Sequence, residues 1–280
     1  MPQSGDAFYD MVEEPTTIGP EATCRVRSSE WTTGPWGPGL QHAGPPSALL
    51  TRAVRRLAGL PERALPARLS FEILTPVPVA ELVVTARVVR PGRRITLAEA
   101  NLASAAAPEQ PAMLLRAWLL RQVGDGEPIP GLPPTPSTAP PGRPEQSDPM
   151  SRPAGWHPGY LDAIEWRWVE GSFERTGPAA VWTRLGVDLV AGETPDGIER
   201  LVAVADSASG ISAVASPAEL LFVNTDLTLH LTREPVGPDI WLRAETLMSP
   251  LGVGRTVGEL GDARGAVAGS AQCLFVAPRD

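Results

Sequence analysis

A run of prolines near the middle of the chain limits the possible folds more than any other feature. Residues 124–158 read GDGEPIPGLPPTPSTAPPGRPEQSDPMSRPAGWHP and show almost no apolar periodicity. Proline fixes φ and removes a backbone N–H donor, so such a run joins neither a helix nor a sheet. Loops of this length are uncommon inside compact domains. The segment predicts a disordered linker between an N-terminal domain, residues 1–123, and a C-terminal domain, residues 159–280. A long surface loop within one domain is the alternative.

The first half contains one helical pattern followed by four strand-like runs. Apolar residues recur at helical spacing across Pro45–Leu60, and prolines open the pattern, where a missing N–H costs little. Runs rich in apolar and β-branched residues, separated by short turns, predict strands. These runs are Ala67–Leu74, Ala80–Arg90, Ile95–Leu102 and Ala112–Val123.

The second half shows a similar order of signals, with two strands ahead of its helix. The helix is predicted over Ile198–Ala215, although Gly210 weakens the pattern. The strands are predicted at Leu161–Glu170, Ala179–Leu189, Leu220–Thr232, Ile240–Met248, Arg255–Gly261 and Ala266–Val276.

The two halves resemble each other weakly. FEILTP at Phe71–Pro76 resembles LHLTRE at Leu229–Glu234, and the turn and strand after Arg90 resemble Leu251–Gly261. Internal similarity of this kind indicates duplication of one unit. A helix that precedes several antiparallel strands, with strand-like text before it, fits a sheet wrapped around one central helix. The fold class predicted is therefore α+β, with two such units in tandem.

Charge and composition exclude several classes of protein. The net charge is −8, whereas a nucleic-acid-binding protein usually carries an excess of positive charge. Two cysteines, Cys24 and Cys273, form neither a disulfide framework nor a metal-ligand spacing, so we expect no metal. We also see no basic-then-apolar leader and no run long enough to span a membrane, which predicts a cytoplasmic protein.

Motifs of other enzyme classes are missing from the sequence. There is no GxSxG turn of the serine hydrolases, and neither a GxGxxG fingerprint nor a phosphate-binding P-loop occurs. We therefore expect no nucleotide cofactor, and indeed no cofactor of any kind.

Three segments carry a resemblance to a known family. They are LQHAGPPSALL at Leu40–Leu50, LVAVADSASGI at Leu201–Ile211, and the pair Phe222–Pro235 and Gly269–Val276. In this order they resemble the acyl-CoA thioesterase II family and its thioesterase-like relatives. The resemblance covers both halves but not the proline-rich segment. It implies a tandem, or double, hotdog fold, an acyl-CoA substrate and pairing into a dimer of double hotdogs.

The resemblance also implies a catalytic site. Asp206 matches the family's catalytic Asp and Gln272 matches its Gln. Aligning Arg233 with the family's Arg puts Asn224 at a position where the family has a hydroxyl residue, and a shift of one residue puts Thr225 there instead. Thioester hydrolysis needs a water, a carboxylate that takes its proton, and donors for the oxyanion. Asp206 would be the general base.

The turn that begins the first helix is the candidate for substrate binding. Helix N-termini offer unpaired N–H donors, and a glycine lets a ligand approach the backbone closely. We therefore expect His42 and Gly44 to bind the substrate. Pro45 and Pro46, however, remove two of the donors that such a terminus normally offers.

Other interpretations of these residues stay open at this stage. Asp206 can be a helix-capping residue, Gln272 a solvent-facing strand residue and Asn224 a turn residue. A protein that binds an acyl group without hydrolysing it, or that acts on a pathway-specific thioester, has the same fold. Hotdog hydratases usually carry an Asp/His pair, and the sequence places no His next to Asp206. The Arg52, Arg55 and Arg56 side chains either solvate a helix end or contact the phosphates of coenzyme A.

Overall fold

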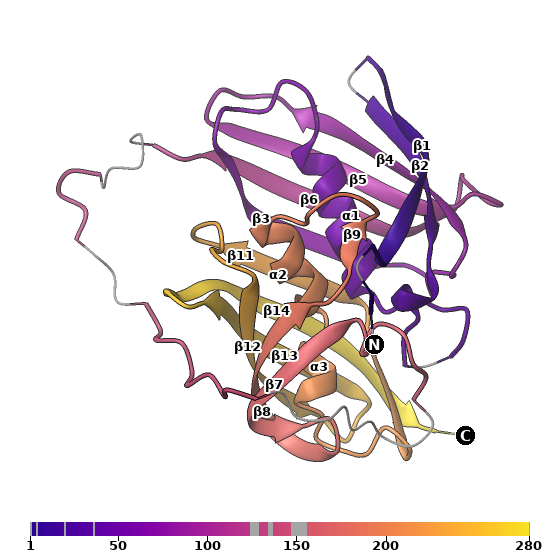
Figure 1. The fold of residues 1–280 in the computed structure, drawn as a ribbon, viewed down its shortest axis with the longest axis vertical. Helices are drawn as coiled ribbons and strands as arrows, with labels where there is room; N and C mark the ends of the chain where they lie inside the picture. Colours follow the sequence, from indigo (N-terminus) through magenta and orange to yellow (C-terminus); the bar gives the residue numbers. More distant parts are fainter. Residues whose placement is uncertain are drawn as a thin grey trace.

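The computed structural model describes residues 2–3, 5–19, 21–35, 37–123, 129–133, 137–146 and 156–279. Two similar units lie next to each other, and each places a helix against a curved antiparallel sheet (Figure 1). The first unit contains β1 (Ala7–Ile18), β2 (Glu21–Ser28), a 3₁₀ turn (Glu30–Thr32), α1 (Gly44–Arg55), β3 (Ala64–Ile73), β4 (Glu81–Arg90), β5 (Ile95–Ser104) and β6 (Pro111–Arg121).

The second unit contains β7 (Ile164–Ser172), β8 (Arg175–Leu185), β9 (Asp188–Val190), α2 (Gly197–Ala205), α3 (Ala208–Ile211), β10 (Leu220–Asn224), β11 (Asp226–Leu231), β12 (Asp239–Met248), β13 (Val253–Asp262) and β14 (Gly265–Pro278). The strands of both units form one sheet in the order β7-β8-β12-β13-β14-β11-β3-β6-β5-β4-β2-β1-β9. β11 and β3 join the units, with Leu227 opposite Phe71. β9 closes the far end by pairing in parallel with β1. The predicted tandem hotdog is confirmed.

The two central helices lie inside the sheet and contact each other. α1 begins with prolines at its first positions and has no side-chain cap. Its predicted end, Leu60, is five residues beyond the observed end at Arg55. α2 begins with a capping box, in which the Asp196 carboxylate accepts from the backbone of Glu199, and the Glu199 side chain accepts from the backbone of Asp196. Its apolar side chains are buried on nearly all sides, as a helix enclosed by a sheet requires.

The helix predicted over Ile198–Ala215 is wrong in its extent. α2 ends at Ala205, and the single turn α3 follows after a break at Asp206 and Ser207. The Ala203 carbonyl accepts from the Tyr160 hydroxyl at 2.8 Å, and the Ser207 N–H turns back to the Val204 carbonyl at 3.1 Å. This tightened turn interrupts the regular α-helical ladder.

Two strand predictions also need correction. The run Leu220–Thr232 is two strands, because Thr225 leaves the ladder between β10 and β11. The Thr225 N–H bonds to the Cys273 carbonyl, and the Thr225 carbonyl accepts from Ile73. The run Ala179–Leu189 is likewise divided between β8 and β9. The register with β14, not the local pattern, decides the first of these breaks.

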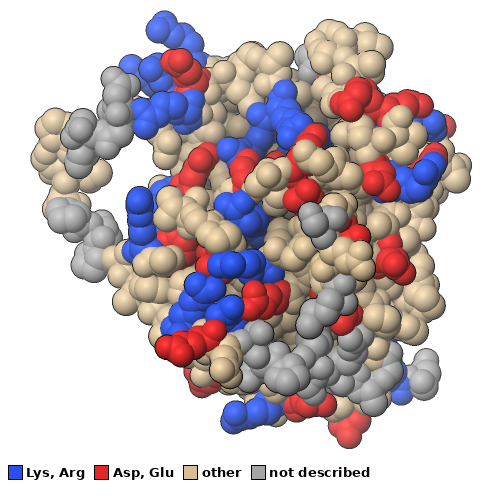
Figure 2. Space-filling model, viewed as in Figure 1, with Lys and Arg blue, Asp and Glu red and all other residues tan. Residues whose placement is uncertain are grey.

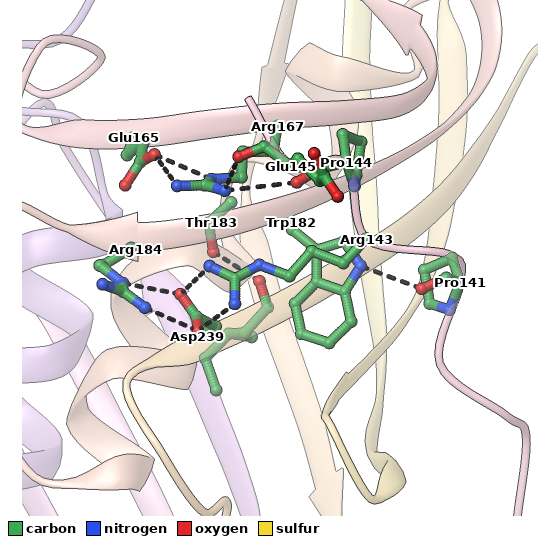
Figure 3. A network of polar contacts seen from close by, with 11 residues as sticks. Pro141, Arg143, Pro144, Glu145, Glu165, Arg167, Trp182, Thr183, Arg184 and Asp239 are labelled. Carbon is green, nitrogen blue, oxygen red and sulfur yellow. Dashed lines mark hydrogen bonds and ion pairs between the residues drawn. The ribbon is translucent and has the colours of Figure 1, made fainter. Parts of the chain in front are cut away.

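Part of the proline-rich segment lies along the outer face of the second unit. Residues 137–146 form neither helix nor strand, yet they bond to residues of β7, β8 and β12 (Figure 3), and Thr138 bonds to Glu259 on β13. The Trp182 indole N–H donates to the Pro141 carbonyl at 3.1 Å, and Arg143 bonds to Asp239 at 3.1 Å. Arg167 donates to the carbonyl of Glu145 at 2.7 Å. Sequence alone predicted no fixed partners here, and the domain boundaries drawn on either side of the segment remain a prediction.

Basic and acidic side chains are interspersed over the surface. Figure 2 shows Arg, blue, next to Asp and Glu, red, across the visible face, including the region near α1 and α2. Arg52, Arg55 and Arg56 at the end of α1 bond to Glu193, Asp196 and Glu234. The suggestion that these arginines contact coenzyme A phosphates gains no support, because acidic side chains of the same chain already pair with them.

Candidate active site

Three side chains predicted from the resemblance meet inside the second unit. Asp206 is the C-cap residue that directly follows α2, and it is only 5% exposed. Its Oδ1 accepts from Asn224 Nδ2 at 2.7 Å and from Gln272 Nε2 at 3.1 Å. A buried carboxylate needs such partners, since an unpaired charge costs far more than the roughly 2 to 7 kcal/mol of an unpaired neutral polar group. The structure thus brings α2, β10 and β14 together at one carboxylate oxygen.

Gln272 faces the interior because of its place on β14. Burial alternates along this strand, with Ser270, Gln272 and Leu274 inside and Cys273 outside. Gln272 is 2% exposed, and its Oε1 accepts from the Ser209 backbone N–H at 3.2 Å. Both ends of the amide are therefore bonded to the turn that carries Asp206. The solvent-facing interpretation of Gln272 is wrong.

Of Asn224 and Thr225, it is Asn224 whose side chain reaches Asp206. Asn224 is the last residue of β10, and its Nδ2 also donates to the Asp226 carbonyl at 3.2 Å. The Asp226 carboxylate in turn accepts from the Cys273 N–H at 2.7 Å. The contacts at the break between β10 and β11 hold the Asn224 amide in place. Asn224 therefore donates to Asp206 from the position where the family resemblance implies a hydroxyl residue.

His42 also lies at this carboxylate. His42 Nδ1 is 3.2 Å from Asp206 Oδ2, and the imidazole is largely but not fully buried. The sequence-based expectation that no His accompanies Asp206 is wrong, because the fold brings two distant segments together. Burial lowers the pKa of His42, and the charge of Asp206 raises it by less, so the net shift is downward.

Tyr160 is a site residue that the sequence did not single out. Its ring stacks on the His42 imidazole with centroids 3.8 Å apart and an interplanar angle of 9°. Its hydroxyl bonds to the Ala203 carbonyl and to Ser207 Oγ, both at 2.8 Å. Burial raises the pKa of Tyr160, so this hydroxyl stays protonated. No periodicity marks Tyr160, since it lies in a turn before β7.

Gly44 takes a different place from the one expected. It is buried at the start of α1, where an added Cβ would overlap the carbonyl of Ala203, and its N–H donates to His42 Nδ1 at 3.1 Å. The preceding residues His42 and Ala43 line an apolar cavity. The tight contact explains why a glycine stands here: α1 and α2 approach each other through it.

An apolar cavity of about 340 Å³ opens beside Asp206. Residues from both units line it, and its wall is mostly hydrophobic, as expected for a pocket that holds an acyl group. Its polar lining includes Gln41, His42, Asp206, Ser207 and Asn224, and of these His42 and Asn224 contact Asp206 directly. The apolar wall includes Leu40, Ile73, Val77, Leu161, Phe173 and Phe222.

Metal-ligand clusters and membrane-spanning helices are both absent from the described residues. No group of three His, Cys, Asp or Glu side chains in the described ranges could hold a metal ion. Among the same residues, no helix has the length and apolar character needed to cross a membrane.

Comparison with known proteins agrees with this architecture. Residues 32–120 match the acyl-CoA thioesterase N-terminal domain, and residues 144–276 match the acyl-CoA thioesterase C-terminal domain. No match was found among curated protein sequences.

Solved structures with the same fold cover almost the whole chain. A thioesterase II from Thermobifida fusca YX has a TM-score of 0.66 at 18% identity, covering 94% of this chain and 95% of its own. The acyl-CoA thioesterase II TesB2 from Mycobacterium marinum has a TM-score of 0.62 at 14% identity, with coverage of 95% and 96%. A protein with the hotdog fold from Alicyclobacillus acidocaldarius has a TM-score of 0.67 at 14% identity, with coverage of 95% and 97%. With both domain matches in order along one chain, the protein belongs to the acyl-CoA thioesterase family and is a thioester hydrolase of the tandem hotdog type.

Proposed function

We propose that this protein hydrolyses an acyl-CoA thioester to the free acid and coenzyme A by attack of a water that Asp206 activates. The observation that carries the proposal is the arrangement of Asp206, whose Oδ1 is held by Asn224 and Gln272 while the side chain lines an apolar cavity. A carboxylate fixed in this way can take a proton from a water placed next to a bound thioester.

Asn224 and Gln272 act through Asp206 in this mechanism. Two N–H donors on Oδ1 fix the rotation of the carboxylate and direct Oδ2 away from them. Oδ2 is then the oxygen that meets the water. The thioester carbonyl is reactive enough that no covalent nucleophile is needed, so positioning and proton transfer supply the catalysis.

The acyl group would occupy the apolar part of the cavity. Ile73 and Val77 from the first unit and Phe173 and Phe222 from the second give the cavity an apolar wall, and Asp206 lines it together with its partners His42 and Asn224. In this proposal the carbonyl carbon lies next to Asp206 and the thiol carrier extends out of the cavity. His42 and Ala43, just before α1, line the same cavity.

The direct test is turnover of purified protein on straight-chain acyl-CoAs of increasing length, followed by release of free thiol. Asp206→Asn keeps the size of the side chain and can still accept from Asn224, but it removes the base. We expect kcat/KM to fall by at least about a hundredfold. Retained folding of the variant is checked by thermal unfolding. Turnover that survives Asp206→Asn would contradict the assignment of the base, and binding without turnover by the parent would favour an acyl-binding role.

The short contact between His42 and Asp206 favours one second candidate, the addition of water to a 2-enoyl thioester. Such a reaction uses an acid and a base on the same water. It leaves the thioester intact, so a 2-enoyl-CoA substrate separates the two reactions. Loss of conjugated absorbance without thiol release would indicate hydration, and thiol release would indicate hydrolysis.

A further inference from the structure

The hydrogen bonds of Asp206 decide which of its oxygens can carry a proton. Oδ1 already accepts from two amide groups, those of Asn224 and Gln272. A carboxylate oxygen that accepts two N–H donors has no free lone pair for a proton. A proton taken from water therefore goes to Oδ2, and Oδ2 lies 3.2 Å from His42 Nδ1.

His42 is held in a state that can accept that proton. Its Nδ1 accepts from the Gly44 N–H at 3.1 Å, so this nitrogen carries a lone pair and the ring proton is on Nε2. Burial lowers the pKa of His42 by more than the charge of Asp206 raises it, which agrees with a neutral imidazole at rest. Tyr160 stacks on the ring and bonds to the Ala203 carbonyl, so the imidazole and the end of α2 are fixed together.

The proton on Asp206 also needs a way out. The Asp206 side chain is 5% exposed and the His42 side chain is 11% exposed, and both line the cavity. The imidazole is therefore the more exposed of the two groups. An imidazole next to it can take a proton at one nitrogen and release another from the opposite nitrogen.

We propose that His42 is a proton relay that carries the proton from Asp206 Oδ2 to the sulfur of the leaving thiol; the proposal rests on the hydrolytic function given above. Water attacks the carbonyl carbon of the thioester and gives one proton to Asp206 Oδ2. The π electron pair of the C=O bond moves to the carbonyl oxygen. The Oδ2 proton then passes to Nδ1, whose lone pair gives up its bond to the Gly44 N–H. The oxyanion reforms the C=O bond, the C–S bond breaks, and the sulfur takes the Nε2 proton of the imidazolium.

Atoms, protons and charge are conserved over these steps. The products are a carboxylic acid and a thiol, Asp206 is again ionised, and His42 is again neutral with its proton on Nδ1. Proton exchange with water in the open cavity returns the ring to its resting tautomer. No oxidant, metal or further reactant takes part.

The test varies the leaving group while the acyl group stays the same. One substrate is an alkyl thioester, acyl-CoA, and the other is a thioester of a nitro-substituted arylthiol, whose weakly basic thiolate leaves without a proton. The variant His42→Gln keeps an oxygen that can accept from the Gly44 N–H, but an amide side chain cannot relay a proton. We expect kcat/KM to fall by about a hundredfold or more on acyl-CoA, the usual size of acid–base catalysis, and by only a few-fold on the aryl thioester.

Two further variants make the outcome decisive. Tyr160→Phe keeps the stacked ring but loses the hydroxyl, so it measures the effect of a less firmly held imidazole. We expect kcat/KM of this variant to fall equally on both substrates, and by less than that of His42→Gln on acyl-CoA. Asp206→Asn should abolish turnover of both substrates. Equal losses for His42→Gln on both substrates would overturn the relay while leaving the proposed hydrolysis intact. Activity of Asp206→Asn on either substrate would overturn the proposed hydrolysis itself.

Discussion

Arg52 in the first unit makes two hydrogen bonds to Glu193 in the second, from Nε at 2.8 Å and from Nη2 at 2.6 Å. The Arg52 side chain is 2% exposed although it carries a permanent charge. Such a fork-to-carboxylate pair has the geometry in which arginine bonds most strongly. It joins α1 to the loop that leads into α2, and so it helps to hold the two central helices together.

Removal of this arginine should destabilise the protein. Arg52→Met keeps much of the buried stem and leaves Glu193 with Arg56 alone. We expect a loss of about 2 kcal/mol, below the 3 to 5 kcal/mol for a fully buried pair, because Glu193 is partly exposed. Chemical denaturation measures the loss. The matched control is Arg56→Met, whose side chain is half exposed and which should cost less than about 1 kcal/mol. Equal effects of the two variants would contradict the prediction.

Glu193 also predicts a dependence of stability on acid pH. Burial raises the pKa of Glu193, but the hydrogen bonds from Arg52 and Arg56 outweigh burial and leave the pKa below its usual value of 4.5. A depressed folded-state pKa contributes stability that is complete above the unfolded-state value and is lost as the pH falls through the folded-state value. We therefore expect the free energy of unfolding to drop below about pH 4.5. In Glu193→Gln this part of the drop should be missing, and an unchanged pH profile would count against the assignment.

Gly44 predicts a sharp contrast between two glycine substitutions. A Cβ at Gly44 would overlap the Ala203 carbonyl, which is backbone and cannot turn away, so Gly44→Ala must push α1 from α2. We expect a loss of about 2 kcal/mol or more. Gly210 in α3 has open space around its Cβ position, so Gly210→Ala should raise stability by about 0.5 kcal/mol through the unfolded state. Thermal unfolding of both variants checks the pair, and a tolerated Gly44→Ala would disprove the close approach.

The amide contacts of Asp206 predict a ranking of activity losses. Asn224→Ala and Gln272→Ala each remove one donor to Oδ1 and let the carboxylate rotate. Because misplacement of a catalytic group by about 1 Å can cost a hundredfold, we expect losses of that order in kcat/KM. Thr225→Ala tests the alternative register and should cost much less. If Thr225→Ala proved the more damaging variant, Asn224 would not be the positioning residue.

The contacts in Figure 3 predict how the proline-rich segment is held. Asp239 accepts from Arg184 at 2.7 and 2.8 Å and from Arg143 at 3.1 Å. Asp239→Asn weakens both arginine contacts, and we expect a loss of about 2 kcal/mol. Arg143→Ala removes only a partly exposed partner and should cost less than about 1 kcal/mol. Denaturation curves for the two variants give the comparison, and the reverse order would mean that the segment itself supplies most of the stability.

Local patterns in the sequence determined the broad architecture. The run of prolines at 124–158 predicts a stretch without helix or strand, because proline has no N–H donor for a sheet, and the described residues 137–146 form neither. Apolar spacing located α1 and the start of α2, and alternation located most strands, because these periods follow from backbone geometry alone. Family resemblance supplied Asp206 and Gln272, which no periodicity distinguishes from capping or surface residues.

Tertiary structure alone decided how the site is assembled. The break after Ala205 depends on a bond from Tyr160, and the break at Thr225 depends on the register with Cys273 on β14. His42 meets Asp206 only because Gly44 lets α1 approach the Ala203 carbonyl. These contacts join segments far apart in the chain. The free energy of these long-range contacts does not depend on local helix or strand propensity. The sequence therefore indicates which chemical groups the site contains, and the packing of two helices inside one sheet decides which of those groups are in contact.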